Sequence, residues 1–230
     1  ADTKVKKGLV INKKKSVCII PIKSFSQRVK NKNFKLIGKK PLFKIIIDKI
    51  IKAKCFDEII IDSDSDIIKK FCIKKNIKYM ERHHSLKKIK TNGNDILNYW
   101  MKKEPNYNAY FLAHVTSPFV KTTSIKQCVK KFLNNSRYNS VFTATKEYSW
   151  YWFKNKPINF KKYKLCRSQD LTPIVRDTTF LYGISKQEFM KKKSRIGSKP
   201  LIYYLDEIES VDINNELDFF ISRNIYKFYF

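Results

Sequence analysis

The 230-residue sequence contains little glycine, proline or cysteine, with 5, 7 and 5 residues respectively. So few glycines and prolines exclude fibrous repeats and low-complexity disorder. The cysteines are odd in number and widely spaced, and no two form a CxxC pair. This spacing predicts neither a disulfide framework nor a zinc site, so we expect reduced thiols.

Long hydrophobic runs are also absent, because no apolar stretch approaches the roughly 18 residues of a membrane-spanning helix. Residues 1–15 are rich in lysine and have no sustained apolar centre, which excludes a signal peptide. We therefore expect a basic N-terminal extension, 1–15, followed by one domain, 16–230, in a soluble cytoplasmic protein without a membrane partner.

Acidic residues are scarce, with 20 Asp and Glu against 49 Lys and Arg, which gives a formal net charge of +29. Such a charge is typical of nucleic-acid-binding proteins. The lysines, however, are spread over every segment, and the chain is rich in Ile, Asn and Phe throughout. We place a compositional origin of the charge ahead of a nucleic-acid partner, with a small polyanionic substrate as the intermediate alternative.

Apolar periodicity predicts strands and helices that alternate along the chain. Strands are expected at 16–22, 57–63, 77–80, 109–113, 140–145, 178–184 and 201–205, and helices at 41–54, 64–75, 93–103, 122–133 and 214–226. Thr91 or Asn94 is expected to cap the helix at 93–103. This order predicts a mostly parallel sheet with helices on both faces.

The segment 146–172 breaks this alternation. It carries an aromatic cluster, Tyr148, Trp150, Tyr151, Trp152 and Phe153. Exposed aromatic residues are typical of partner surfaces, and a local mini-core is an equally good interpretation. We expect this segment to protrude from a single domain.

A basic loop, 23–33, follows the first predicted strand. In open parallel sheets, ligands bind at the carboxyl ends of the strands, and cations there suit phosphate oxygens. The loop contains no glycine, so it is neither a Walker loop nor a GxGxxG turn. Taken alone, the loop is better explained as a solvated basic surface.

Two acidic segments also follow predicted strands. Asp62 to Asp66 alternates carboxylates with serines, which favours a helix cap ahead of a ligand-positioning role. Asp212 and Asn214 would face the same side of an extended chain, where two oxygen ligands can hold Mg²⁺ beside a phosphate. Helix capping by Asn214 or Asn215 is the alternative. His114 has no paired Ser or Cys, which argues against a hydrolase.

Six segments in order resemble the acylneuraminate cytidylyltransferase family, which includes the CMP-sialic acid synthetases. They are Ile20 to Gln27 closing on Lys32-Asn33, Ile61 to Ser65, Glu81-Arg82, Thr116 to Phe119, Arg167 to Leu171, and Val211 to Asn214. The resemblance covers residues 17–222. It implies a Rossmann-like three-layer αβα nucleotide-sugar transferase fold, with a mostly parallel sheet and a protruding dimerisation insertion at 146–172.

The resemblance also implies a nucleotidyltransferase reaction. CMP would pass from CTP to an acidic 2-keto sugar, a sialic acid-like nonulosonate, with release of pyrophosphate. Mg²⁺ is the implied cofactor, and a homodimer through 146–172 is the implied assembly.

Residue roles follow from the same resemblance. The implied nucleotide-binding residues are Lys23, Ser26, Gln27, Lys32, Asn33 and Arg82, with Lys23 and Lys32 catalytic; the implied sugar-binding residues are His114, Thr116, Arg167 and Gln169; the implied Mg²⁺ ligands are Asp212 and Asn214. The family carries Arg, Lys and Asp where this sequence has Lys23, Gln27 and Asn214. A catalytically weakened or inactive member, acting as a nucleotide-binding or scaffold protein, is therefore the alternative function.

Overall fold

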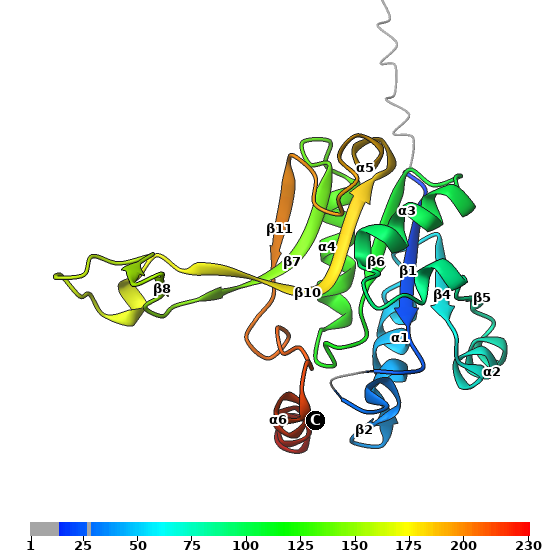
Figure 1. Ribbon diagram of the computed structural model, residues 1–230, viewed down its shortest axis with the longest axis horizontal. Helices are drawn as coiled ribbons and strands as arrows, with labels where there is room; N and C mark the ends of the chain where they lie inside the picture. The colour runs from blue at the N-terminus through cyan, green and yellow to red at the C-terminus, as the bar shows by residue number, and fades with distance from the viewer. Residues whose placement is uncertain (1–13, 27–28) are drawn as a thin grey trace, which may run out of the picture.

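A seven-stranded mixed sheet forms the centre of the computed structural model, which describes residues 14–26 and 29–230 (Figure 1). The strand order is β11-β7-β10-β6-β1-β4-β5. The strands are β1 (Ser16–Ile22), β4 (Glu58–Ser63), β5 (Lys78–Glu81), β6 (Ala109–Ala113), β7 (Ser140–Glu147), β10 (Ile174–Ser185) and β11 (Pro200–Tyr204). Only β10 runs antiparallel to its neighbours in this sheet, so the predicted mostly parallel sheet is confirmed.

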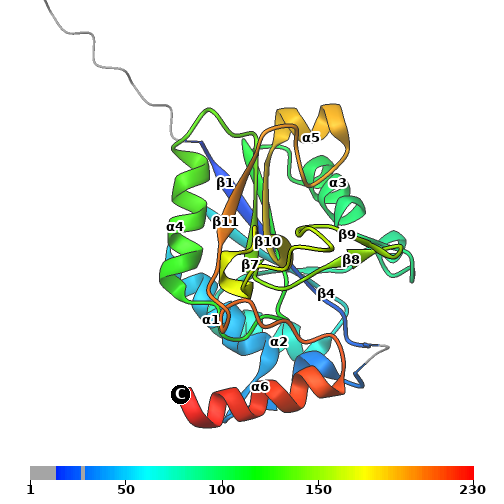
Figure 2. The same cartoon turned by 90° about the vertical axis from the view of Figure 1, so that its left-hand side faces the viewer.

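Helices cover both faces of the sheet, as predicted (Figure 2). One core contains residues of α1 (Leu42–Ala53), α2 (Asp66–Lys75) and α4 (Thr122–Leu133). The other contains residues of α3 (Gly93–Lys103) and α5 (Lys186–Lys192). Strand β1 lies between the two cores, and its residues Val17 to Ile20 are fully buried. A continuous apolar run is what a strand covered on both faces requires.

The start of α3 differs from the prediction. Neither Thr91 nor Asn94 is the cap: the side chain of Asn92 accepts hydrogen bonds from the N–H groups of Asn94 and Asp95, at 2.8 and 3.3 Å. Asp95 accepts in return from the Asn92 N–H at 2.9 Å, which completes a capping box. Asn92 lies between the two predicted candidates, and its reciprocal bond with Asp95 is what distinguishes it.

The C-terminal helix α6 (Glu216–Tyr229) begins after Asn215, one of the two predicted caps. It packs on the small hairpin of β2 (Leu36–Ile37) and β3 (Lys40–Pro41), at the lower end of the sheet in Figure 1. Ile37, Leu42, Ile213 and Phe219 form a separate buried cluster there. This cluster fixes the 211–214 segment beside the carboxyl ends of the parallel strands.

Between β7 and β10 the chain leaves the body as a long protrusion, residues 148–173, which we call the arm (Figure 1). The two strands remain paired out to Glu147 and Ile174, where the arm begins. The arm holds β8 (Trp152–Phe153), β9 (Lys156–Pro157) and a short 3-10 helix, η3 (Ser168–Asp170). Its large apolar side chains are exposed, Trp152 by 51% and Tyr163 by 92%. Within the arm, the Trp152 ring packs edge to face on Phe160, with 5.3 Å between the ring centroids.

The five cysteines are free, and only Cys166, on the arm, is exposed. In the described part of the chain, no helix is long and apolar enough to cross a membrane.

Candidate functional site

The loop after β1 is held at the carboxyl edge of the sheet by its own polar contacts. The Asn33 amide donates to the Lys23 carbonyl at 2.9 Å, and Asp64 accepts from the Ser24 N–H at 2.7 Å. Asp64 therefore positions the loop rather than capping α2. Ser26 lies half-buried in the same loop, and Gln27 lies outside the described residues.

Lys32 connects this loop to the C-terminal segment. It begins the 3-10 helix η1 (Lys32–Phe34), and its Nζ donates to the Ile213 carbonyl at 2.7 Å. The Ile213 N–H in turn donates to the Thr116 carbonyl at 2.9 Å. The three predicted segments around Lys32, Thr116 and Asp212 are thus brought together.

Arg82, the first residue after β5, is buried in an ion pair with Asp62. Its Nε lies 2.8 Å from Oδ1 of Asp62, and the other carboxylate oxygen accepts from Trp100 Nε1 at 3.0 Å. Nη1 of Arg82 is buried and has no hydrogen-bond partner among residues 14–26 and 29–230. A buried donor without an acceptor is costly, so Nη1 suits an acceptor on a ligand.

The charges of Arg82 and Asp62 both affect the pKa of Lys23. Desolvation and the nearby Arg82 charge lower the pKa of Lys23, while Asp64 and Asp62 act in the opposite direction. Lys23, Lys32 and Arg82 therefore place cationic groups around one edge of the sheet, where a polyanion would be stabilised.

His114 follows β6 at the same edge. Although part of the residue remains accessible to solvent, burial lowers the pKa of its imidazole to about 4. The charges of Arg195, Lys32 and Arg82 lower this pKa further, and Asp212 opposes them. The ring is therefore neutral near pH 7, where it can both donate and accept a hydrogen bond.

Asp212 has one carboxylate oxygen that is paired and one that is not, among the residues that the structure describes. Its Oδ2 accepts from the Asn214 amide at 2.6 Å and from the Thr179 hydroxyl at 3.4 Å. Its Oδ1 is buried and lacks a hydrogen-bond partner within the described residues. Thr179 holds this position with a φ of 56°, at an irregularity in β10. Left-handed backbone is uncommon for a β-branched residue and is stored strain at the site.

These two residues fit Mg²⁺ as a partial ligand set. Asp212 offers an unpaired carboxylate oxygen, and Asn214 offers an amide oxygen if its side chain turns. No group of three or more His, Cys, Asp or Glu side chains able to hold a metal occurs where the structure is described. Mg²⁺ commonly takes one or two protein oxygens and completes its shell with phosphates and water.

Arg195 was not predicted and lies at this site. It follows α5, and its guanidinium stacks on the Tyr182 ring at 4.4 Å from the centroid. Its charge is the second largest influence on the pKa of His114, after burial. The loop that carries Arg195 contains no recognisable motif, so no local pattern points to this residue.

Two of the predicted sugar-binding residues lie away from the other predicted site residues of the same chain. Arg167 and Gln169 lie at η3 on the arm, and both are exposed. Arg167 pairs with Asp170 through Nε at 2.8 Å and Nη2 at 3.2 Å.

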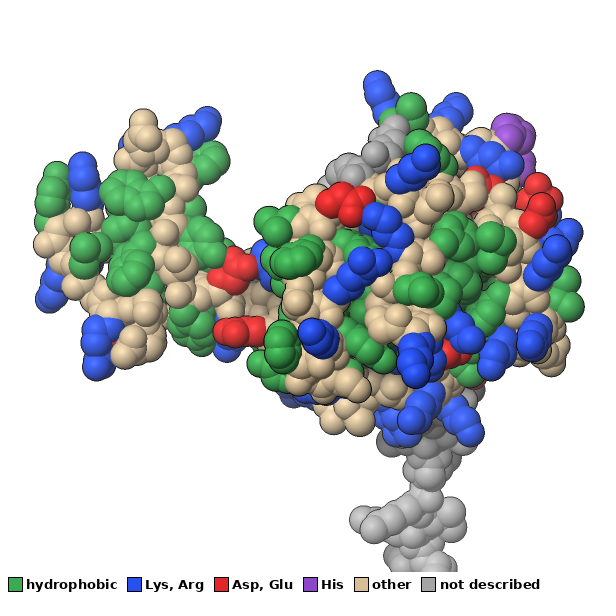
Figure 3. All heavy atoms as spheres, turned by 90° about the horizontal axis from the view of Figure 1, so that it is seen from below, with side chains coloured by type: hydrophobic (Ala, Val, Ile, Leu, Met, Phe, Trp, Pro, Cys, Tyr) green, Lys and Arg blue, Asp and Glu red, His purple; other side chains and the backbone are tan. Residues whose placement is uncertain are grey.

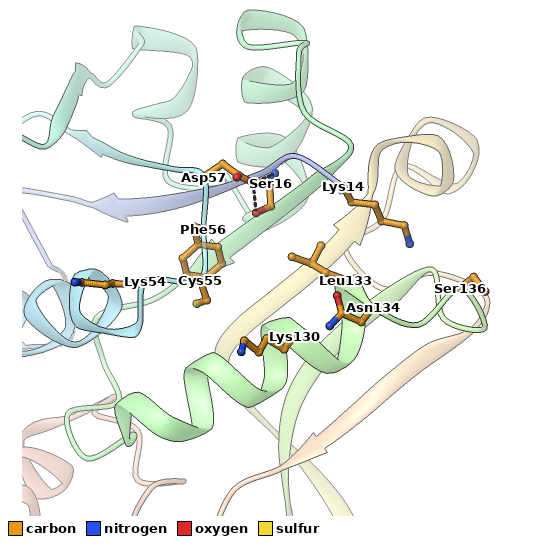
Figure 4. Close-up of a pocket in the computed structure, with 10 residues that line it drawn as sticks. All are labelled: Lys14, Ser16, Lys54, Cys55, Phe56, Asp57, Lys130, Leu133, Asn134 and Ser136. Carbon is orange, nitrogen blue, oxygen red and sulfur yellow. Dashed lines mark hydrogen bonds between the residues drawn. The ribbon is translucent and has the colours of Figure 1, made fainter. Parts of the chain in front are cut away.

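A cavity of about 550 Å³ lies at the opposite edge of the sheet (Figure 4). Ser16, at the start of β1, and Asp57, just before β4, line it, and Asp57 accepts from the Ser16 N–H and hydroxyl at 2.8 and 3.1 Å. It contains none of the predicted site residues. The view from the carboxyl edge instead shows many Lys and Arg side chains on the body, with the arm to one side carrying both hydrophobic and basic side chains (Figure 3).

Comparison with known proteins agrees with this geometry. The cytidylyltransferase family model matches residues 17–194. The chain belongs to this family. The predicted resemblance is thereby confirmed, and the match spans β1, the loop after it, the arm and α5.

Relatives at 25–26% identity are named as cytidylyltransferases of acylneuraminate and of pseudaminic acid. An N-acylneuraminate cytidylyltransferase of Streptococcus agalactiae serotype III (strain NEM316) is 25% identical over 215 residues, 89% of this chain and 52% of the relative. The chain thus spans about half the length of that protein. A pseudaminic acid cytidylyltransferase of Campylobacter jejuni serotype O:23/36 (strain 81-176) is 26% identical over 229 residues, 93% of this chain and 97% of the relative.

Solved structures support the fold. CMP:2-keto-3-deoxy-manno-octonic acid synthetase complexed with CTP superposes with a TM-score of 0.66 at 13% identity, covering 93% of this chain and 98% of that one. A 4-diphosphocytidyl-2C-methyl-D-erythritol synthase from Anaerococcus prevotii DSM 20548 gives 0.69 at 15% identity, covering 94% and 98%. The Rossmann-like α/β nucleotidyltransferase fold is therefore established for this cytidylyltransferase-family chain.

Proposed function

We propose that the protein transfers CMP from CTP to an acidic 2-keto sugar of the sialic acid type and releases pyrophosphate. The observation that carries this proposal is the convergence of Lys23, Lys32 and Arg82 with Asp212 at the carboxyl edge. Relatives named for acylneuraminate, pseudaminic acid and diacetyllegionaminic acid favour a nine-carbon acidic sugar.

The chain's own groups would mainly position and neutralise charge. A sugar hydroxyl attacks the α-phosphate in line, the bond between the α- and β-phosphates breaks, and pyrophosphate leaves with the bond electrons while the hydroxyl proton is released to water. Lys23 and Lys32 would bind oxygens of the triphosphate, with Ser26 and Gln27 in the same loop. Asn33 and Arg82 would contact the ribose or cytosine, since Arg82 keeps one buried donor for an acceptor. His114 and Thr116 would face the sugar.

Mg²⁺ would be held by Asp212 and Asn214, as the unpaired Oδ1 of Asp212 supports. When bound, the ion would neutralise charge on the phosphate oxygens. Asn214 would then give up its bond to Asp212 and present its amide oxygen, which is a neutral ligand in place of a second carboxylate.

We also propose a homodimer formed through the arm. Its exposed apolar residues suit a second copy of the chain, because the core of a protein interface is rich in aromatic groups. Arg167 and Gln169 would then act on the sugar only in the partner's site, since they lie on the arm of their own chain.

The alternative function is nucleotide binding with weak or no turnover. The bond from the Asn214 amide to Asp212 favours it, because that amide nitrogen now occupies a carboxylate oxygen that a metal would use. Pyrophosphate assays distinguish the two functions.

The test is pyrophosphate release by the purified chain with CTP, ATP, GTP or UTP, with and without Mg²⁺. N-acetylneuraminic, legionaminic, pseudaminic and 3-deoxy-octulosonic acids serve as acceptors. We expect Mg²⁺-dependent release with CTP and at least one acid. Tight CTP binding without any release would support the alternative, and failure to bind CTP would contradict both.

A further inference from the structure

Arg195 is held at the site by contacts to two different elements. Its guanidinium carbon lies 4.4 Å from the centroid of the Tyr182 ring on β10. Its backbone N–H donates to the Asn94 side chain, at the start of α3, at 2.9 Å. The absence of a side chain at Gly93 leaves room for it, because a Cβ there would lie 2.9 Å from Nη1 of Arg195. The side chain is thus placed between β10 and α3.

The charge of Arg195 has no carboxylate opposite it. No ion pair to Arg195 occurs within residues 14–26 and 29–230, and its buried Nε lacks a hydrogen-bond acceptor there. The hydroxyl of Tyr182 donates to Asp177 at 2.8 Å and also interacts with the Arg195 side chain, so the unused donor of Arg195 is its Nε. A guanidinium with an unused buried donor is stabilised by an incoming anion.

The position of Arg195 separates it from the triphosphate cations. Lys23 and Lys32 come from the loop after β1, whereas Arg195 lies over Tyr182 beside α3. Both Arg195 and Lys32 act on His114. An anion bound by Arg195 and a triphosphate bound by Lys32 would therefore both lie near the His114 imidazole. The two cations come from different elements of the fold.

We propose that Arg195 binds the carboxylate of the acidic sugar, and this inference rests on the proposed cytidylyltransferase function. The planar guanidinium matches a carboxylate with two parallel hydrogen bonds, which an ammonium cannot do. Tyr182 holds the guanidinium plane in place, so less conformational freedom is lost on binding. Arg195 would thus determine specificity, because it would favour binding of an acidic sugar over a neutral one.

Arg167 is the alternative anchor, and its contacts make it the weaker one. Both its Nε and Nη2 already bond to Asp170, and it lies on the arm. A carboxylate at Arg167 would have to displace Asp170 and would need a second copy of the chain. Arg195 requires neither.

The test measures discrimination between an acid and its ester. The acceptor with the highest kcat/KM in pyrophosphate release is compared with its methyl ester by calorimetry, with cytidine α,β-methylene triphosphate present. We expect Arg195→Gln to weaken acid binding by roughly 10- to 100-fold, the effect of one charged hydrogen-bond pair, and to leave ester binding unchanged. Arg195→Lys should keep part of the preference for the acid, and CTP binding should change less than about twofold in both variants.

Matched controls separate recognition from packing. Arg137→Gln, at an exposed arginine with no role at the site, should keep the discrimination, whereas Gly93→Ala, which crowds Nη1 of Arg195, should reduce it. Equal weakening of acid and ester by Arg195→Gln would assign a structural role and overturn the inference. Loss of discrimination in Arg167→Gln alone would also overturn it.

The proposed function and this inference fail in different ways. A wild-type protein that neither binds CTP nor releases pyrophosphate with any acid overturns both. A wild-type protein that turns over an acid, with normal discrimination in a folded Arg195→Gln variant, overturns only the role of Arg195. Thermal melting shows which variants are folded, and Arg195→Lys replaces Arg195→Gln if the latter is not.

Discussion

The guanidinium of Arg82 and the carboxylate of Asp62 face each other at 2.8 Å with almost no exposure of either side chain, 1% and 0%. They come from the ends of neighbouring parallel strands, 20 residues apart in the sequence. Trp100 from α3 bonds to the same carboxylate. This pair joins the carboxyl edge of the sheet to α3.

Removing one partner of this pair should be strongly destabilising. We expect Arg82→Met to lower the free energy of unfolding by about 3–5 kcal/mol, because Asp62 would keep a buried charge without its cation. Urea denaturation measures this change. Arg167→Met, which breaks the exposed pair with Asp170, should cost less than about 1 kcal/mol. Equal costs for the two variants would contradict the buried ion pair.

His114 should make stability depend on pH below neutrality. Its pKa is lowered from 6.5 to about 4 in the folded protein, so the unfolded chain binds a proton first as the pH falls. Stability is therefore full above pH 6.5 and decreases from there towards pH 4, by about 2–3 kcal/mol.

Urea unfolding of the wild type and of His114→Gln, at pH 7 and pH 4.5, isolates this contribution. We expect the variant to lose less stability between the two pH values than the wild type does. His84→Gln, at an exposed site, should behave like the wild type. A wild-type pH slope in His114→Gln would show that other groups cause the dependence.

Asn214 should control the response to Mg²⁺. In Asn214→Asp, a second carboxylate replaces the amide that now bonds to Asp212 at 2.6 Å. We expect the variant to lose about 1.5 kcal/mol of stability without Mg²⁺, and to regain it with Mg²⁺ as the two carboxylates share the ion.

Thermal melting with EDTA and with Mg²⁺ measures both effects. The matched control is Asn215→Asp, which adds the same charge at the cap of α6, where Asp is also a good cap. Its melting temperature should be nearly insensitive to Mg²⁺. The metal assignment fails if both variants respond alike.

The arm should determine the oligomeric state. Trp152→Ser with Phe153→Ser removes two exposed aromatic groups, and we expect dimer dissociation to become at least about tenfold more favourable. Sedimentation velocity over a concentration series measures it. Ile73→Ser, at an apolar position on α2 that is more exposed than either aromatic residue, should leave the dimer unchanged. A wild-type chain that stays monomeric at all concentrations would exclude the proposed dimer.

Strands of the sheet could be predicted from the sequence where the residues of a single strand already show the apolar pattern of a buried strand. The run from Val17 to Ile20 is apolar because both faces of β1 are covered, and that requirement is visible locally. The seven-residue helix α5 was missed, because it buries only Glu188 and Phe189 and is too short to show a helical period.

Candidate site residues could be predicted where they follow the ends of strands. They could not be predicted where their hydrogen-bond or stacking partners are distant in the sequence. Lys32, His114 and Asp212 follow or lie near predicted strands, and the sheet gathers such ends at one edge. Asp62 and Asp64 have the local pattern of a helix cap, yet they bond to Arg82 and to the Ser24 N–H. Arg195 reaches the site only because Tyr182 and Asn94 lie next to it in space.

Strand β10 connects the arm to the candidate site through one continuous backbone. It contacts both Asp212 and Arg195. From Ile174 at the base of the arm, it passes Thr179, which bonds to Asp212, and then Tyr182, which supports Arg195. A force on the arm therefore acts along the same strand that contacts Asp212, the proposed Mg²⁺ ligand, and the guanidinium of Arg195. In two copies joined by their arms, a displacement at one proposed site would be passed through β10 and the joined arms to the proposed site of the other copy.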